Sequence, residues 1–218
     1  MRCFATIFLL NCCLALQAQP FRDEIQAFQH QDSLVPITPG QVLFVGSSSF
    51  RLWRDVQAYF PGTPIINRGF GGSCLTDMIY YEKQIITPYK PRKIVIYCGE
   101  NDFAASDTTT ANDVFIRFKT LFKSIRADYP HTPIVYISMK PSPSRRTLMN
   151  KIASGNEMIE GYLRRKRHTA FVDVFHRMLD EQGEPRRELF LDDQLHMNQA
   201  GYQIWASALK AQILSKSP

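Results

Sequence analysis

The 218-residue chain contains five cysteines, no tract of low complexity and no internal repeat. The lack of a repeat excludes a solenoid, and the lack of biased tracts excludes a long disordered region. With 44% hydrophobic and 12% aromatic residues, the chain can bury one core of ordinary size, so we expect one domain. Its net charge of +6 is mildly basic and does not indicate a nucleic-acid partner.

The N-terminal apolar stretch, residues 3–16, is short for a membrane span and contains Asn11. It follows Arg2 and precedes a small polar segment, which is the layout of a secretory signal. We therefore expect cleavage after Ala18, leaving residues 19–218 as a single exported domain, periplasmic or extracellular, without stable membrane insertion. Lipid attachment at Cys12, after Leu-Leu-Asn, and a buried N-terminal helix are the alternatives.

Only Cys74 and Cys98 lie beyond this segment. Two cysteines in an exported protein can form a disulfide. Cys98, however, ends an apolar run, where a free thiol behaves as a small hydrophobic side chain. Because pairing depends on geometry, the sequence leaves both alternatives open.

Short apolar runs alternate with longer amphipathic segments along the rest of the chain. The short runs are rich in Val, Ile, Phe and Tyr, as buried parallel strands are, and cover residues 42–45, 64–66, 94–97, 134–137 and 170–172. Helical spacing of apolar residues predicts helices over residues 50–59, 112–129, 148–167 and about 198–215. This alternation predicts a three-layer α/β/α sandwich with a five-stranded parallel sheet in the flavodoxin-like order 2-1-3-4-5.

Sheets of this kind bind ligands beyond the carboxyl ends of the strands where the strand order reverses, here between strands 1 and 3. The first strand runs into Gly46 and three serines. Ser48, at a strand–helix junction, is a candidate nucleophile, and the N–H groups of the helix's first turn are candidate oxyanion donors. Helix capping by these serines is the alternative, and the G-x-S-x-G elbow is absent.

Two further segments offer oxyanion donors. The glycine-rich run NRGFGG follows the second strand and provides the N–H of Gly72, although an ordinary turn would look the same. The run GEND follows the third strand and provides the side-chain amide of Asn101, with an Asn-Asp turn as the alternative.

Asp193 and His196 stand three residues apart in a segment before the last helix. A loop allows the carboxylate to accept from one ring nitrogen while the other nitrogen faces Ser48, as in a catalytic triad. A metal site that includes Asp192 is the rival, but no second histidine cluster has ligand spacing, so we expect no metal and no cofactor.

The blocks VLFVGSSSFRLW, NRGFGG, YCGEND and DDQLHMNQAGY, in this order, resemble the SGNH hydrolases, also called the GDSL esterase/lipase superfamily. The resemblance implies that Ser48 is the nucleophile, His196 the general base and Asp193 its orienting residue. It also implies an oxyanion hole made by Ser48, Gly72 and Asn101. The GSSS segment, in which Ser47 stands where the family commonly has Asp, is similar to a bacterial branch of the platelet-activating-factor acetylhydrolase type.

The expected function is that of a secreted serine esterase acting on short acyl esters, O-acetyl first, on a small molecule or a glycan. The preference for a glycan comes from the resemblance, whereas the lack of a long apolar lid favours short acyl groups. The alternatives are a lysophospholipase or thioesterase, a glycan O-acetyltransferase with the same triad, and a non-catalytic carbohydrate-binding domain. The sequence does not indicate an oligomeric state.

A few polar residues outside the four blocks also need an interpretation. Lys140, Arg145 and Arg146 follow strand 4 and are candidates for contacts with a sugar or an acidic substrate. Glu100 is expected to be structural. The other histidines, at positions 30, 131, 168 and 176, have no partner in sequence that suggests a role.

Overall fold

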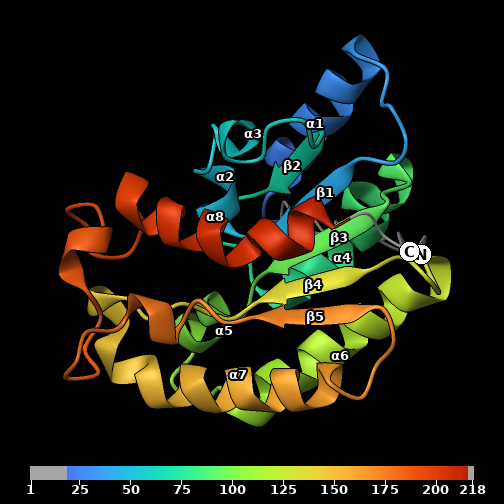
Figure 1. The fold of residues 1–218 in the computed structure, drawn as a ribbon. Coiled ribbons are helices and arrows are strands. Elements are labelled where there is room, and N and C mark those ends of the chain that lie inside the picture. The colour runs from blue at the N-terminus through green and yellow to red at the C-terminus, as the bar shows by residue number, and fades with distance from the viewer. Residues whose placement is uncertain (1–18, 216–218) are drawn as a thin grey trace, which may run out of the picture.

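The computed structural model describes residues 19–215, so the expected signal segment, residues 1–18, lies outside the described residues. Five parallel strands form one sheet in the order β2-β1-β3-β4-β5. The strands are β1 (Val42–Gly46), β2 (Ile65–Gly69), β3 (Lys93–Tyr97), β4 (Ile134–Ile137) and β5 (Thr169–Val172). The predicted fold and strand order are confirmed, and Figure 1 shows the sheet between two layers of helices.

The longer helices are α1 (Arg22–Leu34), α4 (Leu75–Ile85), α6 (Ala111–Asp128), α7 (Met149–Leu163) and α8 (Gln199–Leu214), and the shorter ones are α2 (Ser48–Arg51), α3 (Val56–Tyr59) and α5 (Glu100–Ala105). Four 3₁₀ segments, η1 (Thr87–Tyr89), η2 (Pro143–Leu148), η3 (His176–Met178) and η4 (Arg187–Leu189), complete the connections. Within residues 19–215, no helix combines the length and the apolar character needed to cross a membrane.

The single helix predicted over residues 50–59 is wrong, because the chain turns between α2 and α3. The turn places the fully buried Trp53 against the ring of Tyr202, with the ring centroids 5.0 Å apart. Burial of this large aromatic side chain outweighs the helical spacing of its neighbours. The helix predicted over residues 148–167 also ends early, at Leu163, where the Thr169 hydroxyl donates to the helix's last carbonyl.

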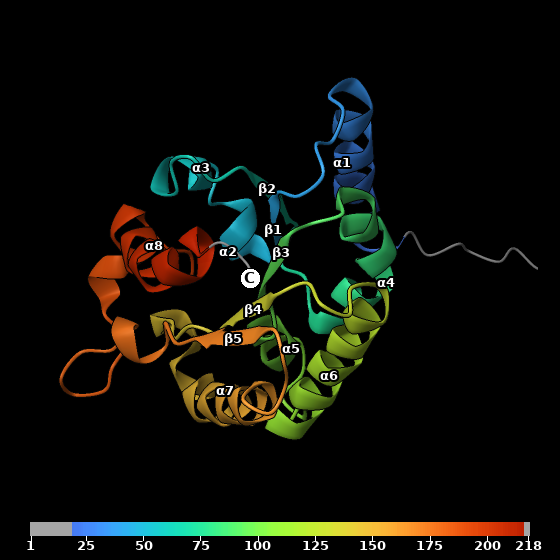
Figure 2. The same cartoon turned by 45° about the vertical axis from the view of Figure 1, so that its right-hand side comes forward.

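The sheet separates two hydrophobic clusters. One cluster lies under α1, α4, α6 and α7 and includes Met78, Phe118 and Ile159. The other lies under α2, α3 and α8 and includes Trp53 and Trp205. Figure 2 shows these two groups of helices on opposite faces of the sheet. Because both faces are covered, the strands carry nearly continuous apolar runs, and only the loops beyond the strand ends are left to hold polar chemistry.

Candidate active site

Strands β1 and β3 approach each other closely at the end of β1, two residues before Ser48. A Cβ atom on Gly46 would lie 2.0 Å from the carbonyl oxygen of Tyr97 on β3, so only glycine fits there. The N–H of Ser47 then donates to the same carbonyl at 3.0 Å. Ser48 follows as the first residue of α2 and is half-buried, with its hydroxyl at the carboxyl edge of the sheet.

Asp193 builds the loop that carries His196. Its Oδ1 atom accepts from the backbone N–H groups of Leu195 and His196, both at 2.9 Å. The N–H of Leu191 donates to the carbonyl of His196 at 2.8 Å and closes the loop. The other carboxylate oxygen, Oδ2, lies 2.6 Å from Nδ1 of the His196 ring. One carboxylate therefore both folds this loop and orients the imidazole.

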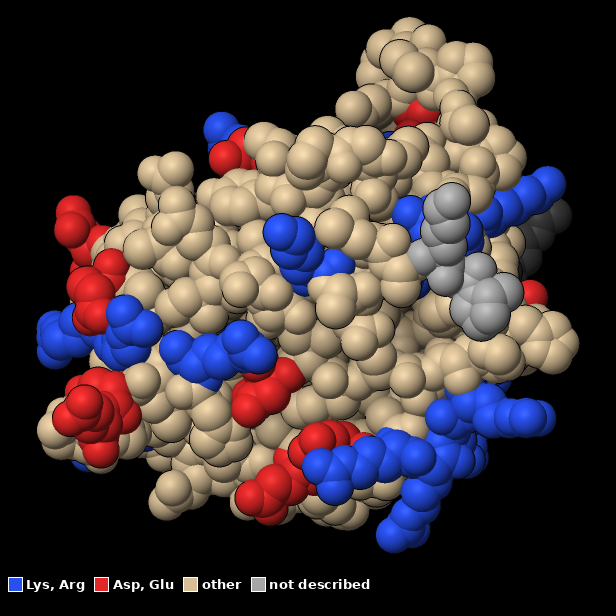
Figure 3. Space-filling view, viewed as in Figure 1, with Lys and Arg blue, Asp and Glu red and all other residues tan. Residues whose placement is uncertain are grey.

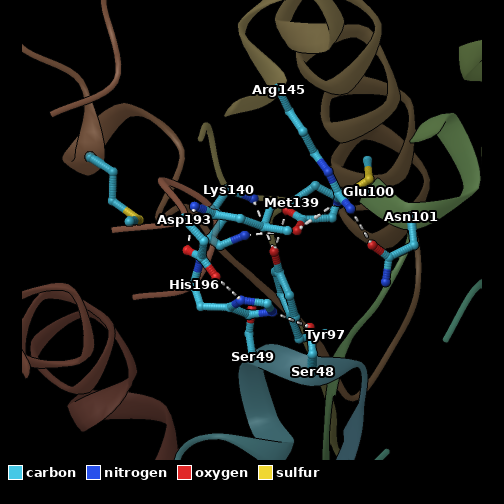
Figure 4. A network of polar contacts seen from close by, with 12 residues as sticks. Ser48, Ser49, Tyr97, Glu100, Asn101, Met139, Lys140, Arg145, Asp193 and His196 are labelled. Carbon is cyan, nitrogen blue, oxygen red and sulfur yellow. Dashed lines mark hydrogen bonds and ion pairs between the residues drawn. The ribbon is translucent and has the colours of Figure 1, made fainter. Parts of the chain in front are cut away.

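The His196 ring connects Asp193 to Ser48. Its Nε2 atom lies 3.1 Å from Oγ of Ser48, as Figure 4 shows. Because an ionised carboxylate can only accept, Nδ1 carries a proton toward Asp193, which leaves Nε2 of the neutral ring as an acceptor for the Ser48 hydroxyl. The structure thus brings together Ser48, His196 and Asp193 in the order in which a nucleophile, a base and an orienting carboxylate act.

Asp193 stays ionised down to low pH. Its partial burial pushes the pKa of the carboxyl group upward, but the hydrogen bonds from His196 and Leu195 outweigh this and lower the pKa to about 2. The carboxylate is therefore negative throughout the range in which a histidine acts as a base.

Gly72 and Asn101 lie next to each other at the same edge of the sheet. A Cβ atom on Gly72 would be 3.8 Å from Nδ2 of Asn101, and that amide nitrogen donates to the carbonyl of Ser73 at 3.1 Å. In the view of Figure 4, His196 lies on one side of Ser48 and Asn101 on the other. Within residues 19–215, the N–H groups of Ser48 and Gly72 donate to no protein acceptor, so both can receive an oxyanion.

Glu100 is buried beneath this edge between two cations. Its carboxylate accepts from Nζ of Lys140 at 2.7 Å, from Arg145 at 3.0 Å and from the hydroxyl of Tyr97 at 2.6 Å. The prediction that Lys140 contacts a substrate is therefore wrong, because its side chain is only 1% exposed and its ammonium group pairs with the Glu100 carboxylate. Arg146 is exposed and pairs with Glu184. The expectation that Glu100 is structural agrees with these contacts.

His176 does have a partner, contrary to the interpretation of the sequence. Asp173, three residues earlier, places Oδ2 2.7 Å from Nδ1 of the His176 ring, and its Oδ1 accepts from the His176 N–H at 3.2 Å. The Asp-x-x-His motif therefore occurs three times in this chain, at 128/131, 173/176 and 193/196, and the last two form the same Oδ2–Nδ1 pair. Among the described residues, only the His196 ring also contacts a serine hydroxyl.

The two cysteines are not joined. Cys74 is half-exposed at the start of α4 and Cys98 is buried after β3, and both are free thiols. Burial raises the pKa of Cys74 to about 12, with the carboxylates of Asp102 and Asp77 adding to the shift. In the part of the chain from residue 19 to 215, no three His, Cys, Asp or Glu side chains form a group that could hold a metal ion.

The charged side chains on the face seen in Figure 1 are of both signs and lie close to one another (Figure 3). Exposed ion pairs also occur among the described residues, such as Arg146–Glu184 and Arg186–Glu188. Such pairs offset each other's field, so the net charge of +6 does not gather there into one basic surface.

Comparison with known proteins gives one family. A model of the GDSL-like lipase/acylhydrolase family matches residues 37–204, which confirms the family resemblance. None of the curated protein sequences is significantly similar to the chain.

Solved structures share the fold. A proposed platelet activating factor from Streptococcus pneumoniae is 24% identical over 88% of this chain and 92% of its own, with a TM-score of 0.76. A GDSL-like lipase from Bacteroides thetaiotaomicron is 20% identical over 87% and 96%, with a TM-score of 0.74. A variant of an acetyl-xylooligosaccharide esterase from Geobacillus stearothermophilus is 15% identical over 83% and 96%, with a TM-score of 0.64.

Proposed function

The chain belongs to the GDSL-like lipase/acylhydrolase family, and on that basis we propose that it is a serine esterase with Ser48 as nucleophile. One observation carries the proposal: the His196 ring lies 3.1 Å from the Ser48 hydroxyl and 2.6 Å from the Asp193 carboxylate. A serine hydroxyl is a weak nucleophile unless a base removes its proton, and this arrangement supplies the base already oriented.

In the first half of the reaction, Oγ of Ser48 attacks the ester carbonyl carbon while Nε2 of His196 takes the hydroxyl proton. The carbonyl oxygen becomes an oxyanion, which the N–H groups of Ser48 and Gly72 and the side-chain amide of Asn101 stabilise. The tetrahedral intermediate then breaks its bond to the alcohol oxygen. That oxygen leaves with the proton from His196, and the acyl group stays on Ser48.

In the second half, a water molecule attacks the acyl-enzyme and gives a proton to Nε2 of His196. The same three donors hold the second oxyanion. When the bond between the acyl carbon and Oγ of Ser48 breaks, His196 returns the proton to Oγ and the carboxylic acid is released. Asp193 remains ionised throughout and stabilises the imidazolium form of His196 in both halves.

We propose that the substrate is a short acyl ester, O-acetyl first, carried by a carbohydrate. Two features support this choice. The segments beyond the strand ends carry polar side chains such as those of Ser144 and Gln194, and within residues 19–215 they contain no long apolar helix that would cover an acyl chain. The acetyl-xylooligosaccharide esterase named above shares the fold.

A chain-length series of aryl esters from acetate to palmitate tests both proposals, with kcat/KM as the measured quantity. We expect the maximum at acetate and a loss of at least about 10³-fold in kcat for Ser48→Ala. Ser49→Ala is the matched control, because Ser49 neighbours Ser48 but is buried, 2% exposed. A maximum at long chains would instead support a lysophospholipase or thioesterase, and product that depends on an added glycan acceptor would support acetyl transfer. Full turnover by Ser48→Ala would overturn the mechanism.

We also propose that residues 1–18 direct export and are removed after Ala18. The intact mass of the protein recovered from the producing cell tests this. A chain that begins at Gln19 supports the proposal. A lipid-modified chain that begins at Cys12, or an uncleaved N-terminus, contradicts it.

A further inference from the structure

The side-chain amide of Asn101 is held at both ends. Its Oδ1 atom accepts a hydrogen bond from the guanidinium of Arg145 at 2.7 Å, and its Nδ2 atom donates to the carbonyl of Ser73 at 3.1 Å. A guanidinium can only donate and a carbonyl can only accept, so these two partners fix which way the amide points. Only one of the two Nδ2 protons is used by Ser73. The other stays available at the edge where Ser48 lies (Figure 4).

Arg145 is itself held in place by the residue before Asn101. One nitrogen of the guanidinium donates to Oε1 of Glu100 at 3.0 Å while another donates to Oδ1 of Asn101. The planar guanidinium thus bridges two consecutive side chains at the start of α5. The Arg145 side chain is 15% exposed and that of Glu100 is 4% exposed. A lysine ammonium, which is a compact point charge, cannot reproduce this two-point contact.

Glu100 remains a carboxylate in this position. Burial alone would raise the pKa of Glu100, but the charges of Lys140 and Arg145 outweigh it and hold the pKa below its ordinary value. The hydroxyl of Tyr97 satisfies the second carboxylate oxygen at 2.6 Å. Both carboxylate oxygens of Glu100 are thus hydrogen-bonded, which holds this buried group in place. The guanidinium of Arg145 itself contacts Oδ1 of Asn101, so its positive charge polarises the amide and favours negative charge developing in front of Nδ2.

We propose that Arg145 is a positioning residue that acts through Asn101, holding the amide with Nδ2 directed at the oxyanion and polarising it as a donor. The inference rests on the proposed esterase function. Arg145 does not touch the reacting atoms in this account. Because the oxyanion exists only in the transition state and the intermediates, loss of Arg145 should lower kcat and leave KM nearly unchanged.

A purely structural role for Arg145 gives different expectations. Arg145 lies in η2, so its contact with Glu100 could serve only to brace that segment against α5. Loss of such a structural contact would lower the melting temperature and change KM. Any fold-loss in kcat would then multiply with the fold-loss caused by removing the Asn101 amide.

A double-mutant cycle separates these roles. We expect Asn101→Ala to lower kcat by about 10²–10³-fold and Arg145→Met by about 10–10²-fold. In the Asn101→Ala background, Arg145→Met should lower kcat by no more than about two-fold further, since its target is already gone. Arg164→Met is the matched control: it removes an arginine whose pair with Glu160 on α7 is exposed, and it should keep kcat within about two-fold of wild type.

Thermal unfolding of each variant identifies any that does not fold. If Arg145→Met fails to fold, Arg145→Lys replaces it in the cycle, because it keeps a charge beside Glu100 but cannot contact Glu100 and Asn101 together. An unchanged kcat in Arg145→Met, or multiplicative losses in the double variant, would overturn the inference. If the wild-type protein shows no Ser48-dependent ester hydrolysis, the proposed function fails instead, so the two failures are distinguishable.

Discussion

The hydroxyl of Ser48 and Nε2 of His196 lie 3.1 Å apart although 148 positions separate the two residues in the sequence. Ser48 is placed by the strand β1 and the helix α2, whereas His196 is placed by a loop that enters α8. The contact therefore depends on the whole sheet. Locally, the close packing at Gly46 positions Ser48, and the turn held by the Asp193 carboxylate positions His196.

Replacing Asp193 with Asn should lower kcat by about 10²–10⁴-fold, because an amide nitrogen facing Nδ1 favours the tautomer whose Nε2 carries the proton and cannot accept from Ser48. Asp173→Asn is the matched control, since Asp173 makes the same local pair with His176. It should keep kcat within about two-fold of wild type. Equal losses in both variants would show that Asp193 does not act through a triad.

The same carboxyl group should contribute to the acid sensitivity of the fold. The pKa of Asp193 is about 2 in the folded protein and about 3.9 in an unfolded chain. A depressed folded-state pKa stabilises the protein above the unfolded value, and this stabilisation is lost as the pH falls through about 2. Urea unfolding from about pH 5 downward should therefore show a smaller loss of unfolding free energy in Asp193→Asn than in wild type. Parallel curves would contradict this.

Cys74 should be unreactive despite its partial exposure. With its pKa raised to about 12 by burial and by nearby carboxylates, only about 10⁻⁴ of the thiol is ionised at pH 8. Alkylation by iodoacetamide, followed peptide by peptide with mass spectrometry, should be slow at Cys74 in the folded protein and fast in urea. Rapid labelling of the folded protein, or a Cys74–Cys98 disulfide in the purified protein, would contradict the described thiol environment.

Two glycine substitutions should have opposite effects on stability. Gly46→Ala places a methyl group 2.0 Å from the Tyr97 carbonyl oxygen, so it should lower the free energy of unfolding by at least about 3 kcal/mol. Gly161→Ala, in the exposed interior of α7 with nothing within 4 Å of the new Cβ, should raise it by about 0.5–1 kcal/mol. Chemical denaturation measures both. Tolerance of Ala at position 46 would rule out the close approach of β1 and β3.

The strands could be predicted because burial on both faces requires continuous apolar runs, which are visible in one dimension. The end of β2 was missed because Asn67 and Arg68 are polar. Arg68 is buried there by its contacts with Asp32 and the hydroxyl of Tyr89, which come from elements distant in sequence. Local patterning cannot show such a partner.

In the candidate site, too, local patterns could be predicted from the sequence, whereas contacts between distant residues could not. The sequence pointed to Ser48, Asn101, Asp193 and His196 because each follows a strand or precedes a helix in a recognisable block. The Asp-x-x-His spacing alone does not separate Asp193 and His196 from Asp173 and His176, because the difference is the distant hydroxyl of Ser48. The burial of Lys140 and the contact of Arg145 with Asn101 have no local signal either, since they arise between the loops after β3 and β4.

The most direct test of the central claim is covalent labelling with a fluorophosphonate, which reacts only with a serine activated as a nucleophile. Mass spectrometry of the digested protein should place one adduct on Ser48, with none on Ser47 or Ser49. Labelling should be lost in His196→Ala and kept in His176→Ala. An adduct on another serine, or no adduct in a protein that hydrolyses esters, would contradict the assignment of Ser48.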